Sequence, residues 1–229
     1  MSNTQTPSNS NPVSIHTEHG ALHGLLEQTP DARALIVLAH AGTTPDAPDS
    51  AHDRSHDDSL ASALRQAGMS TLVIDLMTHQ ETHFTDVINN VPLLAKRLLD
   101  CLALIKRQMS TGELASLPIG LCAAGSVSPV AIRVAGLRDH DIAAVACRGG
   151  LIDLAGMLYL RSLESPLIVL TGETDSGLVA SNQRAFKEIA CTKALEIIPE
   201  TDSHFDSAAA FDKVTQKIVH WFSAHCTAI

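Results

Sequence analysis

The sequence is short of aromatic and of basic residues. Only 3% of its 229 residues are Phe, Trp or Tyr, so aliphatic side chains must pack the core, and the hydrophobic content of 45% is enough for one sizeable domain. Lysine and arginine together number 16 against 25 aspartates and glutamates, which leaves a net charge of −9. This acidic balance, with no Lys/Arg cluster to offset it, excludes nucleic acid and anionic membranes as expected partners.

Targeting and membrane segments are also missing. No apolar run approaches the roughly 18 residues that a membrane span needs. The first twelve residues, MSNTQTPSNSNP, have neither a basic start nor an apolar stretch, so no secretory signal is expected. The cysteines are odd in number and show no C-x-x-C spacing, which favours reduced thiols in a cytoplasmic protein. They are Cys101, Cys122, Cys147, Cys191 and Cys226.

Two kinds of ligand motif do not occur. Neither G-x-G-x-x-G nor G-x-x-x-x-G-K-[ST] is present, so no nucleotide cofactor, and no cofactor of another kind, is expected. The histidine pairs His52/His56 and His79/His83 have i, i+4 spacing, but neither is part of H-E-x-x-H. Both pairs fall in polar stretches that are typical of loops, so no metal site is expected.

The chain is predicted to form a single domain over residues 13–229, after a Ser/Asn/Thr/Pro-rich segment, 1–12, that is expected to be disordered. Val13–Glu18 and Ala21–Glu27 flank a His-Gly turn and predict an antiparallel hairpin. Beyond the hairpin, apolar runs typical of strands buried on both faces alternate with amphipathic stretches typical of helices. This alternation predicts a doubly wound, mainly parallel α/β sheet, and the short connections leave little room for a lid domain.

The expected strands after the hairpin are Ala32–His40, Thr71–Asp75, Leu117–Ala124, Ile142–Cys147, Pro166–Thr171 and Ala194–Ile198. The expected helices are Ser59–Ala67, Val91–Gln108, Val127–Leu137, 178–190 and Ala208–His225. Asn90 is expected to cap the second of these helices, with Pro92 in its first turn.

The chemistry is expected where the parallel strands end. The stretch LPIGLCAAGSVSPV, residues 117–130, is an apolar run that stops at small residues and restarts as a helix, which is the outline of a nucleophile elbow. Asp175 follows a late strand, and His204 lies between the last strand and the last helix. The order elbow, Asp175, His204 is the chain order of the α/β-hydrolase triad, in which the acid orients the imidazole and the imidazole takes the proton of the nucleophile.

From about residue 20 onward the chain resembles the dienelactone-hydrolase-like family of α/β-hydrolases. The matching pieces are LIVLAHAG, STLVIDLMT, VPLLAKRLL, LPIG, AVACRGGLIDLAG, PLIVLTGETD with Asn182, and SHF. The resemblance implies an α/β-hydrolase fold and hydrolysis of small esters or lactones. It also implies an oxyanion hole formed by the backbone N–H of Ala41 and by that of the residue after the nucleophile, which is Val127 if the nucleophile is Ser126.

The elbow departs from the usual pattern, because G-x-S-x-G is absent. Ser126 is the preferred nucleophile, since small residues stand two before and two after it and Pro129 then falls in the first turn of the helix. Cys122 in GLCAAG is an alternative, although it places Pro129 inside the helix. A third reading puts Gly125 at the strained turn and leaves the site without a nucleophile.

Two residues at other strand ends are candidates for the site. His40 is expected to orient the oxyanion loop and to lie near the substrate. Arg148 is expected either to bind a substrate carboxylate or to form an internal ion pair. Asp75 is expected to serve a turn.

The sequence therefore predicts a hydrolase of small esters or lactones that acts through Ser126, Asp175 and His204. The alternative is a catalytically inactive protein of the same fold that binds a small ligand or a protein partner.

Overall fold

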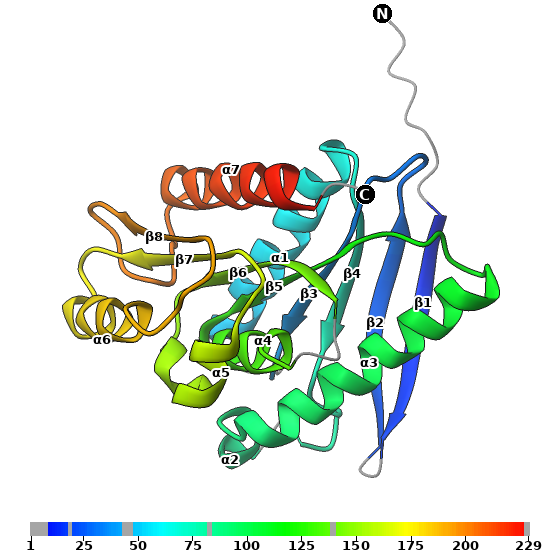
Figure 1. Cartoon of the computed structure of the whole chain (residues 1–229), viewed down its shortest axis with the longest axis horizontal. Helices are drawn as coiled ribbons and strands as arrows, with labels where there is room; N and C mark the ends of the chain where they lie inside the picture. The colour runs from blue at the N-terminus through cyan, green and yellow to red at the C-terminus, as the bar shows by residue number, and fades with distance from the viewer. Residues whose placement is uncertain (1–8, 18–19, 43–47, 82–83, 138–140, 227–229) are drawn as a thin grey trace, which may run out of the picture.

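The computed structural model describes residues 9–17, 20–42, 48–81, 84–137 and 141–226. Within these ranges the chain forms an eight-stranded sheet with helices on both faces (Figure 1). The strands are β1 (Asn9–Thr17), β2 (Gly20–Gln28), β3 (Leu35–His40), β4 (Ser70–Asp75), β5 (Ile119–Ala124), β6 (Ile142–Arg148), β7 (Leu167–Gly172) and β8 (Lys193–Ile198). The α-helices are α1 (Pro48–Gln66), α2 (Thr85–Ile88), α3 (Val91–Thr111), α4 (Ser128–Ala135), α5 (Met157–Ser162), α6 (Ser176–Phe186) and α7 (Ala208–His225). Two 3-10 helices, η1 (Gly125–Val127) and η2 (Ile152–Ala155), follow β5 and β6.

The strands lie in the order β1-β2-β4-β3-β5-β6-β7-β8. Strand β1 pairs antiparallel with β2, and β2 pairs antiparallel with β4, whereas the remaining pairs are parallel. This confirms the predicted mainly parallel sheet with an N-terminal antiparallel hairpin. The order reverses at β3, which lies between β4 and β5, and ligands of such sheets bind beyond the carboxyl ends of the strands at that reversal.

The helices divide between the two faces of the sheet (Figure 1). Helices α1 and α7 cover one face with apolar residues such as Leu60, Leu64 and Phe222. Helices α3, α4, α5 and α6 cover the other, with residues such as Leu98 and Val130. Burying one such side chain contributes about 1.5–3 kcal/mol, so the two cores together hold the strand ends in place.

Capping residues fix where two of the helices begin. The side chain of Asn90 accepts a hydrogen bond from the N–H of Leu93 at 3.1 Å, and a proline lies in the first turn of α3, as predicted. The hydroxyl of Ser207 accepts from the N–H of Ala210 at 3.2 Å and starts α7. The cap at Ser207 limits the length of the loop that carries His204.

Two of the boundaries that differ from the sequence-based expectation are the starts of β1 and α1. Strand β1 begins at Asn9, inside the segment 1–12 expected to be disordered, because its pairing with β2 continues as far as Gln28 and an edge strand tolerates Pro12. Residues 1–8 lie outside the described residues. Helix α1 begins at Pro48 and not at Ser59. The earlier start was not predicted, because the polar residues of the first turns show no apolar periodicity.

The earlier start of α1 changes the reading of the histidines. His52 and His56 belong to a helix and not to a loop. The ring of His56 is buried and stacks on that of Phe211 in α7, with the ring centroids 3.8 Å apart. Of the other pair, His83 lies outside the described residues.

Glu81, in the loop after β4, ties that loop to α3. Its carboxylate accepts hydrogen bonds from Nη2 of Arg97 at 2.6 Å and from the backbone N–H and hydroxyl of Thr78 at 3.0 and 2.8 Å. The buried Arg97 also donates to the carbonyl of Leu76 at 2.8 Å. Burial opposes ionisation of Glu81, but these hydrogen bonds outweigh it and lower the pKa of Glu81 from 4.5 to about 2.

We expect Glu81→Gln to destabilise the protein more at pH 7 than at pH 2.5. Because the folded-state pKa of Glu81 lies below the ordinary value of 4.5, its stabilising effect is fully present above that value and is lost as pH falls towards about 2. Urea unfolding of both proteins at the two pH values measures the difference. Glu164→Gln removes an exposed carboxylate and should change the free energy of unfolding by less than about 0.5 kcal/mol at either pH. An equal loss at both pH values for Glu81→Gln would contradict this account.

Candidate active site

A pocket of about 320 Å³ opens at the carboxyl ends of the parallel strands. Its walls come from the ends of β3 and β6, from the turn between β5 and η1, from α1, and from the loops after β7 and β8. The residues predicted from the sequence that line it are His40, Ala41, Ser126, Val127, Arg148, Asp175 and His204. Segments far apart in the sequence therefore supply one site.

Cys122, the alternative nucleophile, lies in the core and not in this pocket. It is 3% exposed on β5 and packs on the face of the sheet that α1 and α7 cover. Burial raises the pKa of the Cys122 thiol to about 12. At neutral pH the thiol is therefore protonated, and it behaves as a small apolar side chain.

Gly125, and not Ser126, occupies the sharp turn between β5 and η1. Its φ of +52° lies in the left-handed region that favours glycine. A Cβ added to Gly125 would meet nothing within 4 Å, so the space beside the turn is open. Gly150, after β6, presses against the same turn, because a Cβ there would lie 1.9 Å from the carbonyl oxygen of Gly125. The small residues at both positions allow the two backbones to meet.

Ser126 is the second residue of η1 and lines the pocket. Ala124 is the N-cap of η1, so its carbonyl accepts the first hydrogen bond of this 3-10 helix, which comes from the N–H of Val127. The expected oxyanion donor Val127 is therefore engaged within the helix, whereas the N–H of Ser126 has no acceptor there. The hydroxyl of Ser126 and the N–H of Ala41 make no hydrogen bond to any described residue.

Asp175 and His204 reach the pocket from the loops after β7 and β8. Asp175 stands at the N-cap of α6, but its side chain does not cap that helix. Its Oδ2 accepts instead the N–H of Ser203 at 2.7 Å, which fixes the backbone just before His204. The imidazole of His204 is exposed, and within the described part of the chain no hydrogen bond joins it to Asp175 or to Ser126.

His40 lies between two carboxylates. Its Nδ1 is 3.3 Å from Oδ2 of Asp57, and its Nε2 is 3.8 Å from Oδ2 of Asp75. Asp57 also forms a buried ion pair with Nη2 of Arg148. Burial opposes ionisation of Asp57, but the positive charge of Arg148 and the hydrogen bond from His40 outweigh it and hold the pKa of Asp57 below its usual value. Of the two roles expected for Arg148, the structure shows the internal ion pair.

Asp75 serves the turn, as the sequence predicts, and does more. Its Oδ1 accepts the N–H of Gly42 at 3.2 Å and that of Met77 at 2.9 Å. The first of these bonds holds Gly42, the residue after Ala41, and both residues line the pocket. Asp75 therefore fixes the backbone beside Ala41, whereas the role expected for His40 in orienting this loop stays a prediction.

Asp57 is a charged lining residue that was not predicted from the sequence. The polar stretch that contains His52 and His56 was expected to be a loop, so no fixed position could be assigned to its carboxylates. The signal that could have found it is helical spacing, because Asp57 stands three residues before Leu60 and seven before Leu64, both of which are buried. On a helix these three residues share a face, and that face packs beside the end of β3.

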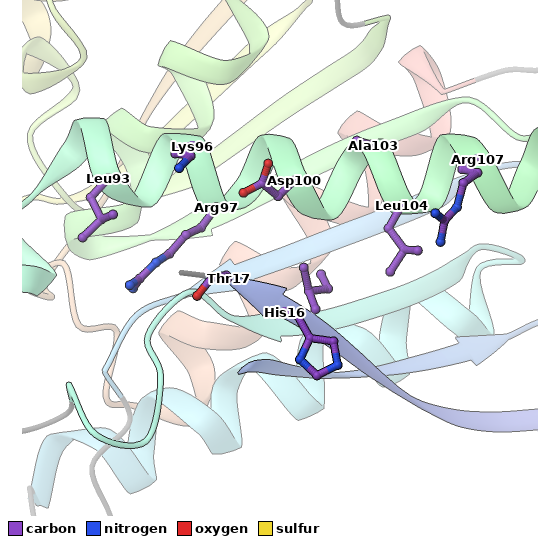
Figure 2. Close-up of a pocket in the computed structure, with 10 residues that line it drawn as sticks. His16, Thr17, Leu93, Lys96, Arg97, Asp100, Ala103, Leu104 and Arg107 are labelled. Carbon is purple, nitrogen blue, oxygen red and sulfur yellow. The ribbon is translucent and has the colours of Figure 1, made fainter. Parts of the chain in front are cut away.

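A larger hollow, of about 740 Å³, lies between β1 and α3 (Figure 2). Its lining includes Ile15, Lys96, Asp100 and Arg107 and none of the residues predicted for the site. In the described part of the chain, no three His, Cys, Asp or Glu side chains are grouped so as to hold a metal ion. No described helix combines the length and apolarity that crossing a membrane requires.

Comparison with solved structures identifies the fold. The crystal structure of dienelactone hydrolase from Anabaena variabilis superposes with a TM-score of 0.82 and 26% identity, covering 96% of this chain and 99% of that one. Est1E from Butyrivibrio proteoclasticus matches with a TM-score of 0.69 and 12% identity over 93% and 99% of the two chains. A cold-adapted esterase from an Arctic intertidal metagenomic library matches with a TM-score of 0.67 and 15% identity over 99% and 100%.

The strand order and the helices on both faces of the sheet are those of the α/β-hydrolase fold. The chain is similar to dienelactone hydrolase in sequence and in fold, in agreement with the resemblance of its sequence pieces, and its structural neighbours are hydrolases and esterases. No family model matches the sequence.

Curated relatives carry a different description. Two Mycobacterium tuberculosis proteins, from strains CDC 1551 and H37Rv and each named "Putative phosphoribosyl transferase", are 30% identical over 193 residues. That match covers 84% of this chain but 41% of each relative. The chain therefore spans less than half the length of the curated relatives it matches.

Proposed function

We propose that this protein hydrolyses a small ester or lactone in the pocket at the strand ends. The observation that carries the proposal is that Ser126, Asp175, His204 and Ala41 line one pocket of about 320 Å³. A hydroxyl, an imidazole, a carboxylate and backbone N–H donors are the groups that acyl transfer requires. The likeness to dienelactone hydrolase and to esterases supports the same reaction class.

In the proposed mechanism, Oγ of Ser126 attacks the carbonyl carbon of the substrate while the imidazole of His204 accepts the hydroxyl proton. The negative charge that develops on the carbonyl oxygen is stabilised by the N–H groups of Ala41 and Ser126. The protonated imidazole then gives its proton to the leaving alcohol oxygen. A water molecule, activated by the same imidazole, cleaves the acyl-enzyme and restores the serine.

Asp175 acts in this mechanism by fixing the loop that bears His204. Its carboxylate holds the N–H of Ser203, the residue next to the histidine. On binding of a substrate, the exposed imidazole must move within hydrogen-bond reach, about 2.6–3.2 Å, of the hydroxyl of Ser126. Such tightening is common, since catalytic hydrogen bonds are often long before a ligand binds.

Phosphoribosyl transfer, named for the mycobacterial relatives, is less well supported by the pocket. More than half of each relative lies outside the matched region. A ribosyl diphosphate needs cationic or Gly-rich phosphate-binding groups. The Arg148 side chain that lines the pocket is already paired with Asp57.

We expect Ser126→Ala to abolish labelling by a fluorophosphonate probe and hydrolysis of p-nitrophenyl acetate, because the probe reacts with an activated serine. Cys122→Ala is the matched control and should leave labelling unchanged, since Cys122 is buried away from the pocket. Gel fluorescence and the release of p-nitrophenol measure the two outcomes. Labelling that persists in Ser126→Ala would contradict the assignment of Ser126.

A second candidate function is binding of the same class of ligand without turnover. The observation that favours it is the position of Gly125 at the turn, φ +52°, where the elbow carries no side chain. In that case the pocket and its N–H donors are retained while the reactive hydroxyl is missing. Absence of labelling in the wild-type protein, together with measurable binding of a small ester, would favour this function over hydrolysis.

A further inference from the structure

We propose that the pocket selects an uncharged ester or lactone over one that carries a carboxylate or phosphate, and that Asp57 is the residue that sets this preference by neutralising Arg148. The inference names the substrate class of the proposed function. It concerns binding, however, and so holds whether or not the bound molecule is turned over.

The positive charge of Arg148 is already neutralised by the carboxylate of Asp57. Its Nη2 contacts Oδ1 of Asp57, and the two side chains are 3% and 7% exposed. The guanidinium carbon lies 5.7 Å from the centre of the Phe211 ring, on the side of α7. A substrate anion would have to share this guanidinium with a buried carboxylate that already neutralises its charge, which makes binding of an anion unfavourable.

The other charged groups of the pocket do not favour an anion either. Asp175 adds a negative charge, and each ring nitrogen of His40 faces a carboxylate. Among the described lining residues, Arg148 is the only lysine or arginine. The segment 43–47, TTPDA, contains neither lysine nor arginine, and the chain as a whole carries a net charge of −9. The field of the protein therefore opposes entry of an anion.

The rest of the lining suits a small uncharged molecule. Ala41, Ile88, Val127 and Leu178 give aliphatic walls. A volume of about 320 Å³ is at the small end of the range for ligand pockets. The backbone N–H groups of Ala41 and Ser126 are left to hold a carbonyl oxygen, which an ester or lactone supplies without a net charge.

The test uses a matched pair of ligands, dimethyl glutarate and monomethyl glutarate, which share a skeleton and differ in one negative charge at pH 7.5. Binding is measured by isothermal titration calorimetry on His204→Ala, so that turnover does not consume the ligand. We expect the dimethyl ester to bind at least about tenfold more tightly, with the difference shrinking at high salt. Tighter binding of the monomethyl ester, or no measurable binding of either, would overturn the inference.

A charge-matched pair of variants tests the role of Asp57. Asp57→Asn frees Arg148 and should improve binding of monomethyl glutarate by about tenfold, with little effect on the dimethyl ester. Asp58→Asn removes the neighbouring exposed carboxylate and should change neither. Arg54→Gln is measured in parallel, because the side chain of Arg54 lies outside the described part of the chain. If Asp57→Asn is folded and gains nothing for the anion, or if anion binding depends on Arg54, the assignment to Asp57 is wrong.

The two proposals fail in different ways. Should Asp57→Asn not fold, the ligand pair on His204→Ala still decides the preference of the pocket. If the wild-type protein neither reacts with the probe nor hydrolyses the ester, the proposed function is wrong. If the pocket still prefers the dimethyl ester in that case, the inference about Asp57 and Arg148 holds.

Discussion

Replacement of Gly125 by serine is expected to add a hydroxyl that reacts with a fluorophosphonate probe and, if the wild-type protein binds esters without turnover, to raise the rate of ester hydrolysis by about a hundredfold or more. The new hydroxyl would stand on the turn itself, where a Cβ meets nothing within 4 Å and opens into the pocket that His204 lines. General-base catalysis to a positioned hydroxyl contributes roughly 10²–10⁴-fold. The N–H groups of Ala41 and Ser126 would then face the carbonyl oxygen of the acyl group, as in an elbow with its nucleophile on the turn.

The serine at position 125 strains the backbone, and the control variant must carry the same strain. A side chain at φ +52° is strained by about 1–2 kcal/mol, which the fold can absorb. Gly125→Ala imposes the same strain without a hydroxyl and should show no gain. The rate is measured as kcat/KM for p-nitrophenyl acetate, and the new serine is located by fluorophosphonate labelling and peptide mapping. The combination of Gly125→Ser with His204→Ala should lose the gain.

If folded Gly125→Ser neither labels nor accelerates hydrolysis, the turn is not aligned with His204 and the elbow is not a site of acyl transfer. If it labels while the wild type does not, the pocket is competent and the native chain lacks only the nucleophile. The experiment therefore separates the hydrolase that uses Ser126 from the protein that binds without turnover.

The architecture was predictable because its signals are local. Buried strands such as Leu35–His40 are short apolar runs. Helix α3 was predictable from its capping residue Asn90 and from the apolar spacing along its length. Once strands and helices alternate, a parallel sheet and a site at the strand ends follow from topology. The positions of Asp175 and His204 in the pocket could be derived in this way, although their catalytic roles stay proposals.

The parts that could not be predicted depend on contacts between distant segments. The first turns of α1, in the stretch PDSAHDRSHDD, are polar and lack apolar spacing, so their composition resembled a loop. The pairing of Asp57 with Arg148 joins residues 91 positions apart and leaves no local pattern. The turn at Gly125 was one of three registers that the small residues of the elbow allowed, and only the backbone fixed by β5 and by the close approach of Gly150 decides among them.

The ion pair between Asp57 and Arg148 leads to the second large prediction. We expect Asp57→Asn to lower the free energy of unfolding by about 3–5 kcal/mol at pH 7, because it leaves a buried guanidinium without its counterion. The Nε of Arg148 already has no hydrogen-bond partner among the described residues, so the loss of the Asp57 carboxylate leaves still more of the buried guanidinium unpaired. Asp58→Asn, the exposed neighbour, should change stability by less than about 0.5 kcal/mol.

The pH dependence of the same pair supplies an independent check. Because the pKa of Asp57 in the folded protein is below 3.8, its contribution is complete above that value and is lost as pH falls through the lower folded-state pKa. Urea unfolding midpoints of wild type and Asp57→Asn should therefore differ at pH 7 and converge in strong acid. A double replacement, Asp57→Leu with Arg148→Met, removes both charges and should recover most of the loss, since paired apolar side chains avoid the desolvation of either ion. If the double variant is no more stable than Asp57→Asn, the loss comes from packing at α1 and not from the uncompensated charge.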